Sequence, residues 1–532
     1  MDEAKSAGGL TLPRRRLLLG AGAGLVAAPF VLRSSLAFAL GKADPFTLGV
    51  ASGDPAPDGF VLWTRLAPDP LAPDGSGGLA GAIPVDWEIA EDEAMARVVS
   101  RGTAQADDRF AHSVHVEAGG LKPGRPYWYR FTALGARSPV GRAMTAPAPG
   151  APLDRLRFCF ASCSNWEVGY FSAYRHMAEE QPDLVLFLGD YIYEYSHGAG
   201  QDVVRRHDRP GEIKDLAGYR NRYALHRTDP DLQALHAAAP CLMTWDDHEV
   251  QNDYANRWSE DMDVPPADFL VRRAAAYRAF YEHMPLRRRS LPNGPDMRVY
   301  DRLRFGDLVE FSLLDGRQYR TIQPCAAPHS RKGHVADPAC AERTDPSRTM
   351  LGFEQERWLH DGFKASTARW NVIAQDLLIT SYAQKDPKTG MVGHWTDGWD
   401  GYPATRTRML NAVAESKVSN PVFLGGDIHS FWTTDLKADF DQQDSATVAT
   451  EFVGTSITSD GPSYDLFVQT LPLNPHVKFF DSRQRGYVGV EVTPGRMETR
   501  FQAISDRRDP HATVSTLKRW VVETGKPGAV PA

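Results

Sequence analysis

Four places in the sequence combine an apolar run with side chains that bind metals. These side chains are those of Cys163; of Asp190 and Tyr193; of Asp246, Asp247, His248 and Asn252; and of Asp427 and His429. If the fold brings the carboxylates together, repulsion and lost hydration raise their pKa values, at a cost of about 1.36 kcal/mol per pKa unit. Multivalent cations remove that cost. Thiolate and phenolate groups favour a transition metal, whereas carboxylate and amide oxygens favour Ca²⁺ or Mg²⁺, so the mixture predicts a centre with two kinds of metal.

The stretch 185–198 indicates how such a centre can be built. Its apolar residues end in a glycine, and Asp190 then offers two oxygens that can bridge two cations. Tyr193 is near enough in the chain to turn back and donate a phenolate, for which Fe³⁺ is the best match. Ordinary roles remain open, because Asp190 can cap a helix, Tyr193 can line a rim, and Cys163 can pack in a core or pair with Cys241.

These places belong to a longer alternation of strands and helices. Apolar strands are expected within 156–163, 182–190, 239–249, 308–318, 369–376 and 420–429. Helical periodicity is found within 170–181, 268–284, 353–366 and 404–416. Continuous apolar strands that alternate with helices predict a sheet covered on both faces, which presents ligands at the carboxyl ends of its strands. The sequence therefore predicts an α/β domain with a polar site at one edge.

Residues 45–147 have a different pattern. Short alternating stretches are separated by Gly, Pro and Asp, as in a small antiparallel sandwich. Tyr127 and Tyr129 are expected on one face of a strand and Trp128 on the other. A segment rich in Pro and Ala, 148–154, then forms a linker. A chain of 532 residues is long enough for three or four domains, and these patterns favour two folded units.

The first forty residues have the pattern of an export signal. Arginines at 14–16 precede an apolar stretch at 17–32, and Ala37 and Ala39 form an A-x-A cleavage pattern. The arginines resemble the twin-arginine type of signal, so the expected partner is the twin-arginine export machinery. An uncleaved anchor is the alternative, but the stretch is short for a membrane span. We therefore expect cleavage after Ala39, a periplasmic or extracellular location, and no membrane span afterwards.

Composition narrows the class of function. Hydrophobic residues make up 42% of the chain and charged residues 24%, as in globular proteins. The formal net charge is only −7, with both signs mixed, which gives no support for nucleic acid or an anionic membrane surface as a partner. Of the five cysteines, Cys325 and Cys340 are the expected disulfide in an oxidising compartment.

Seven motifs carry a resemblance to a known family. They are "FTLGVASGDP", "FASC", "GDYIYEY", "WDDHEVQNDY", "LDGRQYR", "GHWTDGWDGYP" and "GGDIHS". In these motifs and their order, the chain resembles the alkaline phosphatase D (PhoD-like) family of calcineurin-like metallophosphoesterases, which leave the cytoplasm by the twin-arginine route. The resemblance runs from about residue 46 to beyond 490. It implies an α/β fold, a two-sheet metallophosphoesterase sandwich flanked by helices over 155–532, preceded by a small all-β domain like fibronectin type III.

The resemblance also implies a centre of one Fe³⁺ with Ca²⁺. By motif position, the residues around iron would be Cys163, Asp190, Tyr193 and His429. The residues near calcium would be Asp190, Asp247 and Asp427, with Asp246 and Asn252 as further oxygen ligands. Which acid of the Asp246 and Asp247 pair faces the metal stays open.

The expected reaction is hydrolysis of a phosphate monoester or diester. A metal-bound hydroxide attacks phosphorus at a centre held by Asp190, and His248 acts on the departing oxygen, although a structural hydrogen bond to an acid is its alternative role. Arg317, His394 and Trp399 are candidates for contact with the substrate, and Arg317 also fits a structural ion-pair network. The alternative activities on the same site are those of a phospholipase D-like or a teichoic-acid-type phosphodiesterase.

Two further expectations concern loops and function class. The loops expected to select the substrate are 199–232, 321–350 and 383–400. In the family a C-terminal helix can cover the site, and Leu517, Trp520 and Val521 have the spacing for a short lid helix. A different class, an exported adhesion or binding protein, would use the acids for structural calcium alone. Iron content and activity on p-nitrophenyl esters separate these two classes.

Overall fold

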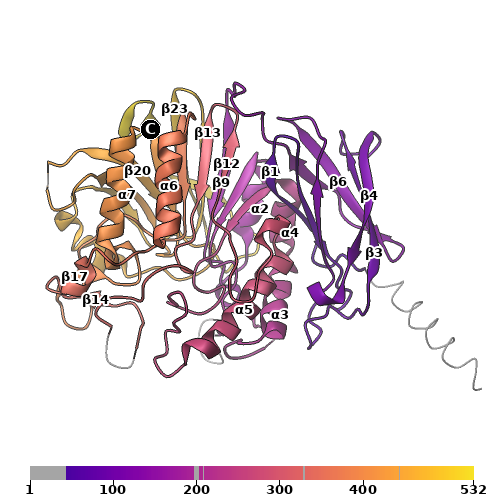
Figure 1. The fold of residues 1–532 in the computed structure, drawn as a ribbon, viewed down its shortest axis with the longest axis horizontal. Coiled ribbons are helices and arrows are strands. Elements are labelled where there is room, and N and C mark those ends of the chain that lie inside the picture. The colour runs from indigo at the N-terminus through magenta and orange to yellow at the C-terminus, as the bar shows by residue number, and fades with distance from the viewer. Residues whose placement is uncertain (1–43, 197–202, 208, 327–329, 443) are drawn as a thin grey trace, which may run out of the picture.

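The protein's computed structural model describes residues 44–196, 203–207, 209–326, 330–442 and 444–532. Two sheets packed face to face, with helices on both outer sides, form the larger body, and an all-β unit lies beside it (Figure 1). The expected export signal, residues 1–40, falls outside the described residues. In the part of the chain that is described, no helix combines the length and apolar character needed to cross a membrane.

The larger sheet has ten strands, in the order β25-β24-β23-β22-β9-β10-β11-β1-β2-β5. In chain order they are β1 (Val50–Ala56), β2 (Gly59–Arg65), β5 (Ser113–Ala118), β9 (Leu156–Ala161), β10 (Leu184–Leu188), β11 (Cys241–Thr244), β22 (Gly486–Val492), β23 (Arg496–Ile504), β24 (Val514–Glu523) and β25 (Lys526–Pro531). Strands β9, β10 and β11 are parallel neighbours, with Leu186 opposite both Phe160 and Leu242. Their carboxyl ends therefore lie together at one edge.

The facing sheet has seven strands, in the order β12-β13-β15-β18-β20-β19-β21. They are β12 (Asp301–Phe305), β13 (Val309–Leu313), β15 (Trp370–Ala374), β18 (Pro421–Gly425), β19 (Phe431–Lys437), β20 (Thr447–Val453) and β21 (Val477–Asp481). Leu186 of the first sheet shares one buried cluster with Phe311 and Leu424 of the second. Val185 and Phe187, which alternate with it on β10, pack instead against helices. This double burial explains why the strand is continuously apolar.

Helices cover both outer faces of the two sheets (Figure 1). On the larger sheet they are α2 (Ser172–Glu179), α3 (Leu216–Arg227), α4 (Pro230–Ala238) and α5 (Pro266–His283). On the smaller sheet they are α6 (Phe353–Ala365) and α7 (Pro403–Ser416), and the short α8 (Tyr464–Val468) lies near its edge strands. The 3₁₀ turns are η1 (Asp108–Phe110), η2 (Trp166–Val168), η3 (Arg288–Ser290), η4 (Ala341–Thr344), η5 (Trp399–Gly401) and η6 (Leu471–Leu473).

The N-terminal unit is all-β, as the sequence predicts. Strands β3 (Ile83–Ala90), β4 (Val98–Ala106), β6 (Pro126–Ala133), β7 (Ala136–Arg137) and β8 (Gly141–Met144) form one sheet, which packs on β1, β2 and β5. Tyr127 and Tyr129 are buried between them and Trp128 is half-buried on the other face, which confirms the predicted alternation. Gly53 on β1 pairs with Cys241 on β11, so this unit extends the larger sheet.

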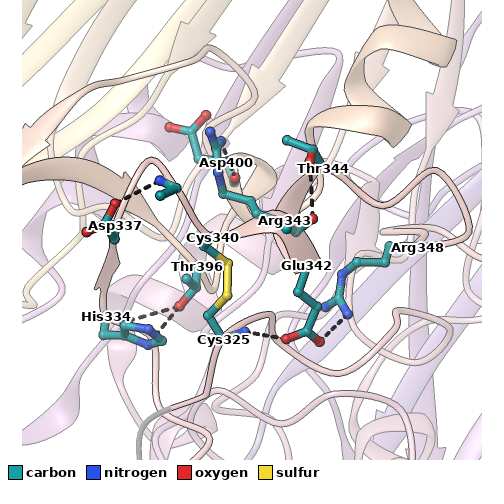
Figure 2. Close-up of a disulfide and its surroundings, with 12 residues drawn as sticks. Cys325, His334, Asp337, Cys340, Glu342, Arg343, Thr344, Arg348, Thr396 and Asp400 are labelled. Atoms are coloured by element: carbon teal, nitrogen blue, oxygen red, sulfur yellow. Dashed lines mark hydrogen bonds and ion pairs between the residues drawn. A yellow bond between two sulfur atoms is a disulfide. The ribbon is translucent and has the colours of Figure 1, made fainter.

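A three-stranded sheet and a disulfide organise the segment 325–395. The strands are β14 (Val335–Ala336), β16 (Gln384–Lys385) and β17 (Val392–Trp395). The predicted bond between Cys325 and Cys340 is present and closes a loop that contains β14 (Figure 2). Beside it, the Cys325 amide donates to Glu342 over 2.7 Å, and the His334 amide donates to Thr396 over 3.1 Å. Residues 334–336 of this loop are therefore held beside β17 and Thr396.

All six strands and four helices of the α/β pattern are confirmed, but two expectations are wrong. Residues 514–523 form strand β24 rather than a lid helix, because Trp520 and Val522 alternate into the core between the sheets. The segment is short and rich in β-branched residues, and the spacing of its apolar residues fits both the period of a helix and that of a strand. The expected loop 199–232 contains helix α3 and the start of α4, which the sequence pattern missed because the buried face of α3 carries polar residues such as Asn221 and His226.

Candidate metal centre

The four predicted ligand positions follow four strands, each of which runs parallel to its neighbours in its own sheet or to one of them. Cys163 lies just after β9, Asp190 just after β10 and Asp246 just after β11, in neighbouring strands of the larger sheet. Asp427 lies just after β18 in the facing sheet. The expectation of a single sheet edge is therefore refined, because the site lies where the edges of two packed sheets meet.

The backbone at the ligand positions is unusual. Cys163, Asp190, Asp427 and His429 have φ values of 64°, 51°, 60° and 53°, in the left-handed region that non-glycine residues seldom adopt. Such conformations cost free energy and are maintained by the surrounding structure, most often at functional sites. Gly189 allows the turn after β10 to lie close to the turn after β11, because a Cβ atom on it would lie only 2.4 Å from the Cβ atom of Asp246.

Thiol, carboxylate, phenol and imidazole groups meet on one side of the site. Single ligand atoms of Cys163, Asp190 and His429 lie within 4.8 Å of one another. The Tyr193 hydroxyl donates to Asp190 Oδ2 over 2.9 Å and lies 3.2 Å from His429 Nε2. His429 Nδ1 lies 2.6 Å from the Asp460 carbonyl, which favours a proton on Nδ1 and leaves Nε2 as the ligand atom. The predicted iron ligands are therefore adjacent.

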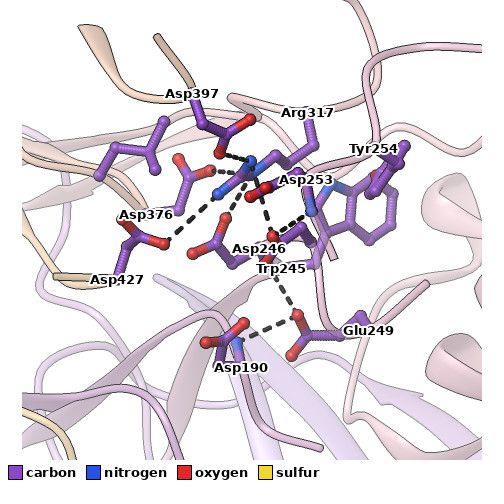
Figure 3. Close-up of polar contacts among 12 residues, drawn as sticks. Asp190, Trp245, Asp246, Glu249, Asp253, Tyr254, Arg317, Asp376, Asp397 and Asp427 are labelled. Atoms are coloured by element: carbon purple, nitrogen blue, oxygen red, sulfur yellow. Dashed lines mark hydrogen bonds and ion pairs between the residues drawn. The ribbon is translucent and has the colours of Figure 1, made fainter. Parts of the chain in front are cut away.

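A second group of acids surrounds Arg317 (Figure 3). Ligand oxygens of Asp246, Asp247 and Asp427 lie within 4.8 Å of one another. The Arg317 guanidinium contacts Asp246 directly, donates to Asp397 over 2.6 Å, and lies 3.5 Å from Asp427 Oδ1. Arg317 is completely buried, so it belongs to an ion-pair network and does not face the cavity. The expectation of substrate contact through Arg317 is therefore replaced by this structural role.

Burial controls the electrostatics of both groups. It raises the pKa of Asp190 and Asp427 well above the usual range, and repulsion from Asp246 adds to this increase. Burial also acts to raise the pKa of Asp247, but the charges of Arg317 and His248 outweigh it and the pKa is lowered. Burial and the nearby charge of Asp190 raise the pKa of the Cys163 thiol. Bound cations would oppose the increases at Asp190, Asp427 and Cys163, because they stabilise the charged forms.

Several buried polar atoms fit a role as metal ligands. Asp190 Oδ1, Asp246 Oδ2 and Asp247 Oδ1 are buried and accept no hydrogen bond from the described residues. Both carboxylate oxygens of Asp376 are also buried and accept no hydrogen bond from the described residues. Because buried polar atoms are nearly always paired, unpartnered oxygens gathered here fit a site that binds cations. The donor set of oxygens, one sulfur, one phenol and one imidazole thus fits two kinds of metal.

His248 is held by an acid that the sequence analysis did not single out. His248 Nδ1 lies 2.7 Å from Glu194 Oε2, and Glu194 Oε1 accepts the Asn252 amide over 2.8 Å. The Asn252 side chain donates to Glu260 over 2.8 Å. Glu194 lies between Tyr193 and Tyr195 in the "GDYIYEY" motif, so its position in the motif was the available signal.

Other acids of the site were also missed. Glu249 accepts the amides of Asp190 over 3.0 Å and of Asp246 over 2.8 Å, and so joins two of the ligand-bearing turns. Asp253, Asp397 and Asp247 bring ligand oxygens within 4.8 Å of one another. Asp376 ends the expected strand 369–376 just as Asp427 follows β18, but it stands alone, without a second ligand type beside it.

A cavity of about 680 Å³ opens onto the site. The predicted residues that line it are Asp190, Asp247, His248, Asn252, Trp399, Asp427 and His429. Asp247 therefore faces the cavity, whereas its neighbour Asp246 is buried beside Arg317. His394 does not line this cavity. His394 lines a neighbouring cavity instead. Adjacent residues of a strand face opposite sides, and Trp395 is the one that faces the site.

Comparisons with known proteins agree with this geometry. A sequence model described as PhoD-like phosphatase matches residues 158–501, and one described as its N-terminal domain matches residues 33–147. Alkaline phosphatase D of Bacillus subtilis (strain 168) is 45% identical over 536 residues, covering 97% of this chain and 89% of that protein. The chain belongs to the PhoD-like phosphatase family.

A solved structure supports the same assignment at the level of the fold. The structure titled "Structure of PhoD" is 44% identical and superposes with a TM-score of 0.86, covering 92% of each chain. The expected resemblance, the α/β two-sheet fold with its all-β N-terminal domain, and the class of enzyme, a phosphoric ester hydrolase, are thereby confirmed. Metal dependence is a property of this family, and the grouped ligands agree with it.

Proposed function

We propose that this PhoD-like phosphatase hydrolyses phosphate esters at a centre of one Fe³⁺ and Ca²⁺. The proposed iron ligands are Cys163, Asp190, Tyr193 and His429. The proposed calcium ligands are Asp190, Asp246, Asp247, Asn252 and Asp427. The observation that carries the proposal is the meeting of a thiol, a phenol and an imidazole at Asp190, next to a separate cluster of acids. Soft and hard donors are thus already sorted into two adjacent sites.

Within this site the chain's own residues have distinct tasks. When bound, the cations supply neutralisation of the phosphate oxygens and activation of water for in-line attack. Glu194 holds His248 through Nδ1, which leaves the opposite edge of the imidazole to face the cavity. There His248 can donate a proton to the departing oxygen. Glu249 keeps the turns that carry Asp190 and Asp246 at a fixed separation.

We also infer that the enzyme works outside the cytoplasm as two folded units. The arginines at 14–16 and the cleavage pattern ending at Ala39 support twin-arginine export to the periplasm or exterior. The bond between Cys325 and Cys340 supports an oxidising compartment. The units are residues 45–147 and 155–532, joined by 148–154, in agreement with the two matched ranges.

One experiment tests the proposed function. The values of kcat/KM on p-nitrophenyl phosphate and bis-p-nitrophenyl phosphate are measured with the metal content of the same sample. Turnover of either ester by a protein that holds iron and calcium supports the proposal, and the ratio decides between monoester and diester preference. A colourless calcium protein that leaves both esters intact contradicts it and supports an exported binding protein.

A further inference from the structure

The cavity over the proposed metal centre is lined by two chemically different sets of side chains. One set, called the acidic wall here, includes Asp190, Asp247 and Asp427. The other, called the apolar wall, includes Leu378, Trp395 and Leu466. Trp395 is 40% exposed, and the two leucines are only half-buried. Apolar side chains in a hollow that also contains an acidic cluster are typical of sites that bind a ligand with one charged and one apolar part.

The apolar wall is built before any ligand arrives. Leu378 packs against the buried cluster formed by Tyr382, Trp432 and Phe480. The Tyr382 hydroxyl donates to the carbonyl of Phe467 over 2.7 Å and so fixes α8, the helix that carries Leu466. A preformed surface of this kind does not have to be ordered on binding, so its contacts contribute more fully to affinity.

The position of Trp395 is fixed from the other side. The indole lies so close to Gly333 that a Cβ atom there would be 2.5 Å from Trp395 Cζ2. Gly333 belongs to the segment between Cys325 and Cys340, and its amide donates to Asp253 over 2.8 Å. The indole therefore lies against Gly333 at the cavity wall, although much of the side chain is exposed.

We propose that the phosphate ester of this enzyme carries an apolar alkyl or aryl group, which contacts Leu378, Trp395 and Leu466 while the phosphate lies at the acidic wall. The inference rests on the proposed function, since it concerns the organic group of the same ester. Both walls line one continuous cavity, so an ester whose phosphate reaches the acids has the apolar wall beside its organic group. Apolar area removed from water on binding favours such an ester over a smaller one.

Two lysines offer a competing basis for selection. Lys332 and Lys385 also line the cavity, and Lys332 is 59% exposed and lies 3.4 Å from Glu260. If they selected the substrate through a second anionic group, added alkyl length would have no effect and salt would weaken the preference. Selection by the apolar wall predicts that added alkyl length raises kcat/KM and that salt has little effect.

The test uses two homologous series that differ only in alkyl length. Methyl and hexyl esters are compared as methyl alkyl phosphate diesters and as alkyl phosphate monoesters, at low and high salt. In the series that the enzyme hydrolyses, kcat/KM for the hexyl ester is expected to exceed that for the methyl ester by about tenfold or more, with little effect of salt. The variant Leu466→Ser is expected to reduce this ratio below about threefold.

A control variant and a second cavity variant separate failure of this inference from failure of the proposed function. Leu473→Ser removes a leucine that is 57% exposed on neighbouring η6 and does not line this cavity, so the ratio should remain. Trp395→Ser provides a second variant, because an exposed side chain can be removed with little risk to folding. Equal rates for methyl and hexyl esters, or an unchanged ratio in both cavity variants, overturn the inference alone. Failure to hydrolyse any ester overturns the proposed function and the inference with it.

Discussion

Tyr193 and Asp190 are three residues apart in the chain, and their side chains meet, with the phenol hydroxyl 2.9 Å from Asp190 Oδ2. The left-handed backbone conformation at Asp190 turns the chain so that the Tyr193 side chain can reach this carboxylate. The same hydroxyl lies 3.2 Å from His429 Nε2 and accepts a hydrogen bond from Ser459 over 2.6 Å. The phenol therefore stands between ligand atoms from both sheets, where a phenolate could bind the metal.

Replacing Tyr193 by Phe removes that oxygen and keeps the ring. We expect loss of any visible phenolate-to-iron absorption and a fall in kcat of about 100-fold, since the loss of even an outer-shell partner of a metal ligand costs about 10- to 100-fold. Absorption spectra and steady-state rates measure both effects. Tyr195→Phe, on the adjacent aromatic residue, serves as the control. A Tyr193→Phe protein that keeps its colour and rate would remove the phenol from the metal.

Glu194→Gln tests the positioning of His248. The 2.7 Å contact with Nδ1 fixes the orientation and the proton of the imidazole, so its loss should lower kcat by about 10- to 100-fold and change KM by less than about threefold. Initial-rate kinetics on one ester separate the two constants. Glu212→Gln, a change at a carboxylate paired with Arg272 away from the cavity, should leave both unchanged. A rise in KM alone would argue that Glu194 only shapes the binding site.

Arg317→Met tests whether the buried guanidinium compensates the negative charges of the surrounding acids. Its guanidinium is completely buried among carboxylates, and removing it leaves their charges uncompensated. We expect the free energy of unfolding to fall by about 3–5 kcal/mol in chelator and by clearly less with added Ca²⁺, which can neutralise the same acids. Denaturant titrations in the two buffers measure this difference.

The matched control is Arg289→Met, at an arginine whose side chain is 56% exposed in its pair with Asp301. Such a surface pair contributes less than about 1 kcal/mol, and added calcium should not alter the effect. If the loss in Arg317→Met is the same with and without calcium, the acids around Arg317 are not a cation site.

The contact between Arg65 and His283 predicts a pH effect on stability. The Arg65 guanidinium lies 2.7 Å from His283 Nε2, and His283 Nδ1 lies 2.7 Å from the Ala279 carbonyl, so the imidazole must be neutral. Burial lowers the pKa of His283 well below its usual value, and the charge of Arg65 lowers it further. The unfolded chain then binds a proton that the folded one does not, so stability is present above about pH 6.5 and declines below it.

The measurement compares the wild type with His283→Gln. Between the unfolded and folded pKa values of His283, the free energy of unfolding should fall by up to about 1.4 kcal/mol per pH unit through this residue. The variant keeps a donor and an acceptor but cannot titrate, so its denaturation midpoint should depend less on pH from about 7.5 to about 5. Equal pH dependence of the two proteins would assign the effect to other groups.

The sequence predicted the strands of the site because each is buried on both faces and ends in polar ligands. Val185 and Phe187 pack on helices while Leu186 packs between sheets, which makes such a strand apolar throughout. Helix α3 gave no such signal, since residues like Asn221 and Arg222 lie on its buried side. Strand β24 was predicted as a helix because the apolar residues of so short a segment fit the period of a helix as well as that of a strand.

The site itself was predictable only in part. Asp190 and Asp427 could be found because each stands after a strand with a second ligand type nearby. Glu194 and Glu249 act through hydrogen bonds to other site residues, and that role depends on turns from separate strands approaching one another. His394 and Trp395 were distinguishable only once β17 was known to be a strand, which places them on opposite sides.

The most direct test of the proposed metal centre is the metal content and visible spectrum of the purified protein beside those of Cys163→Ala. We predict iron at close to one equivalent, with calcium, and a phenolate-to-iron absorption band in the wild type; the variant should lose the iron, the band and the turnover of phosphate esters together. A wild-type protein that is fully active without iron, or a Cys163→Ala variant that keeps its colour and its rate, would contradict the account.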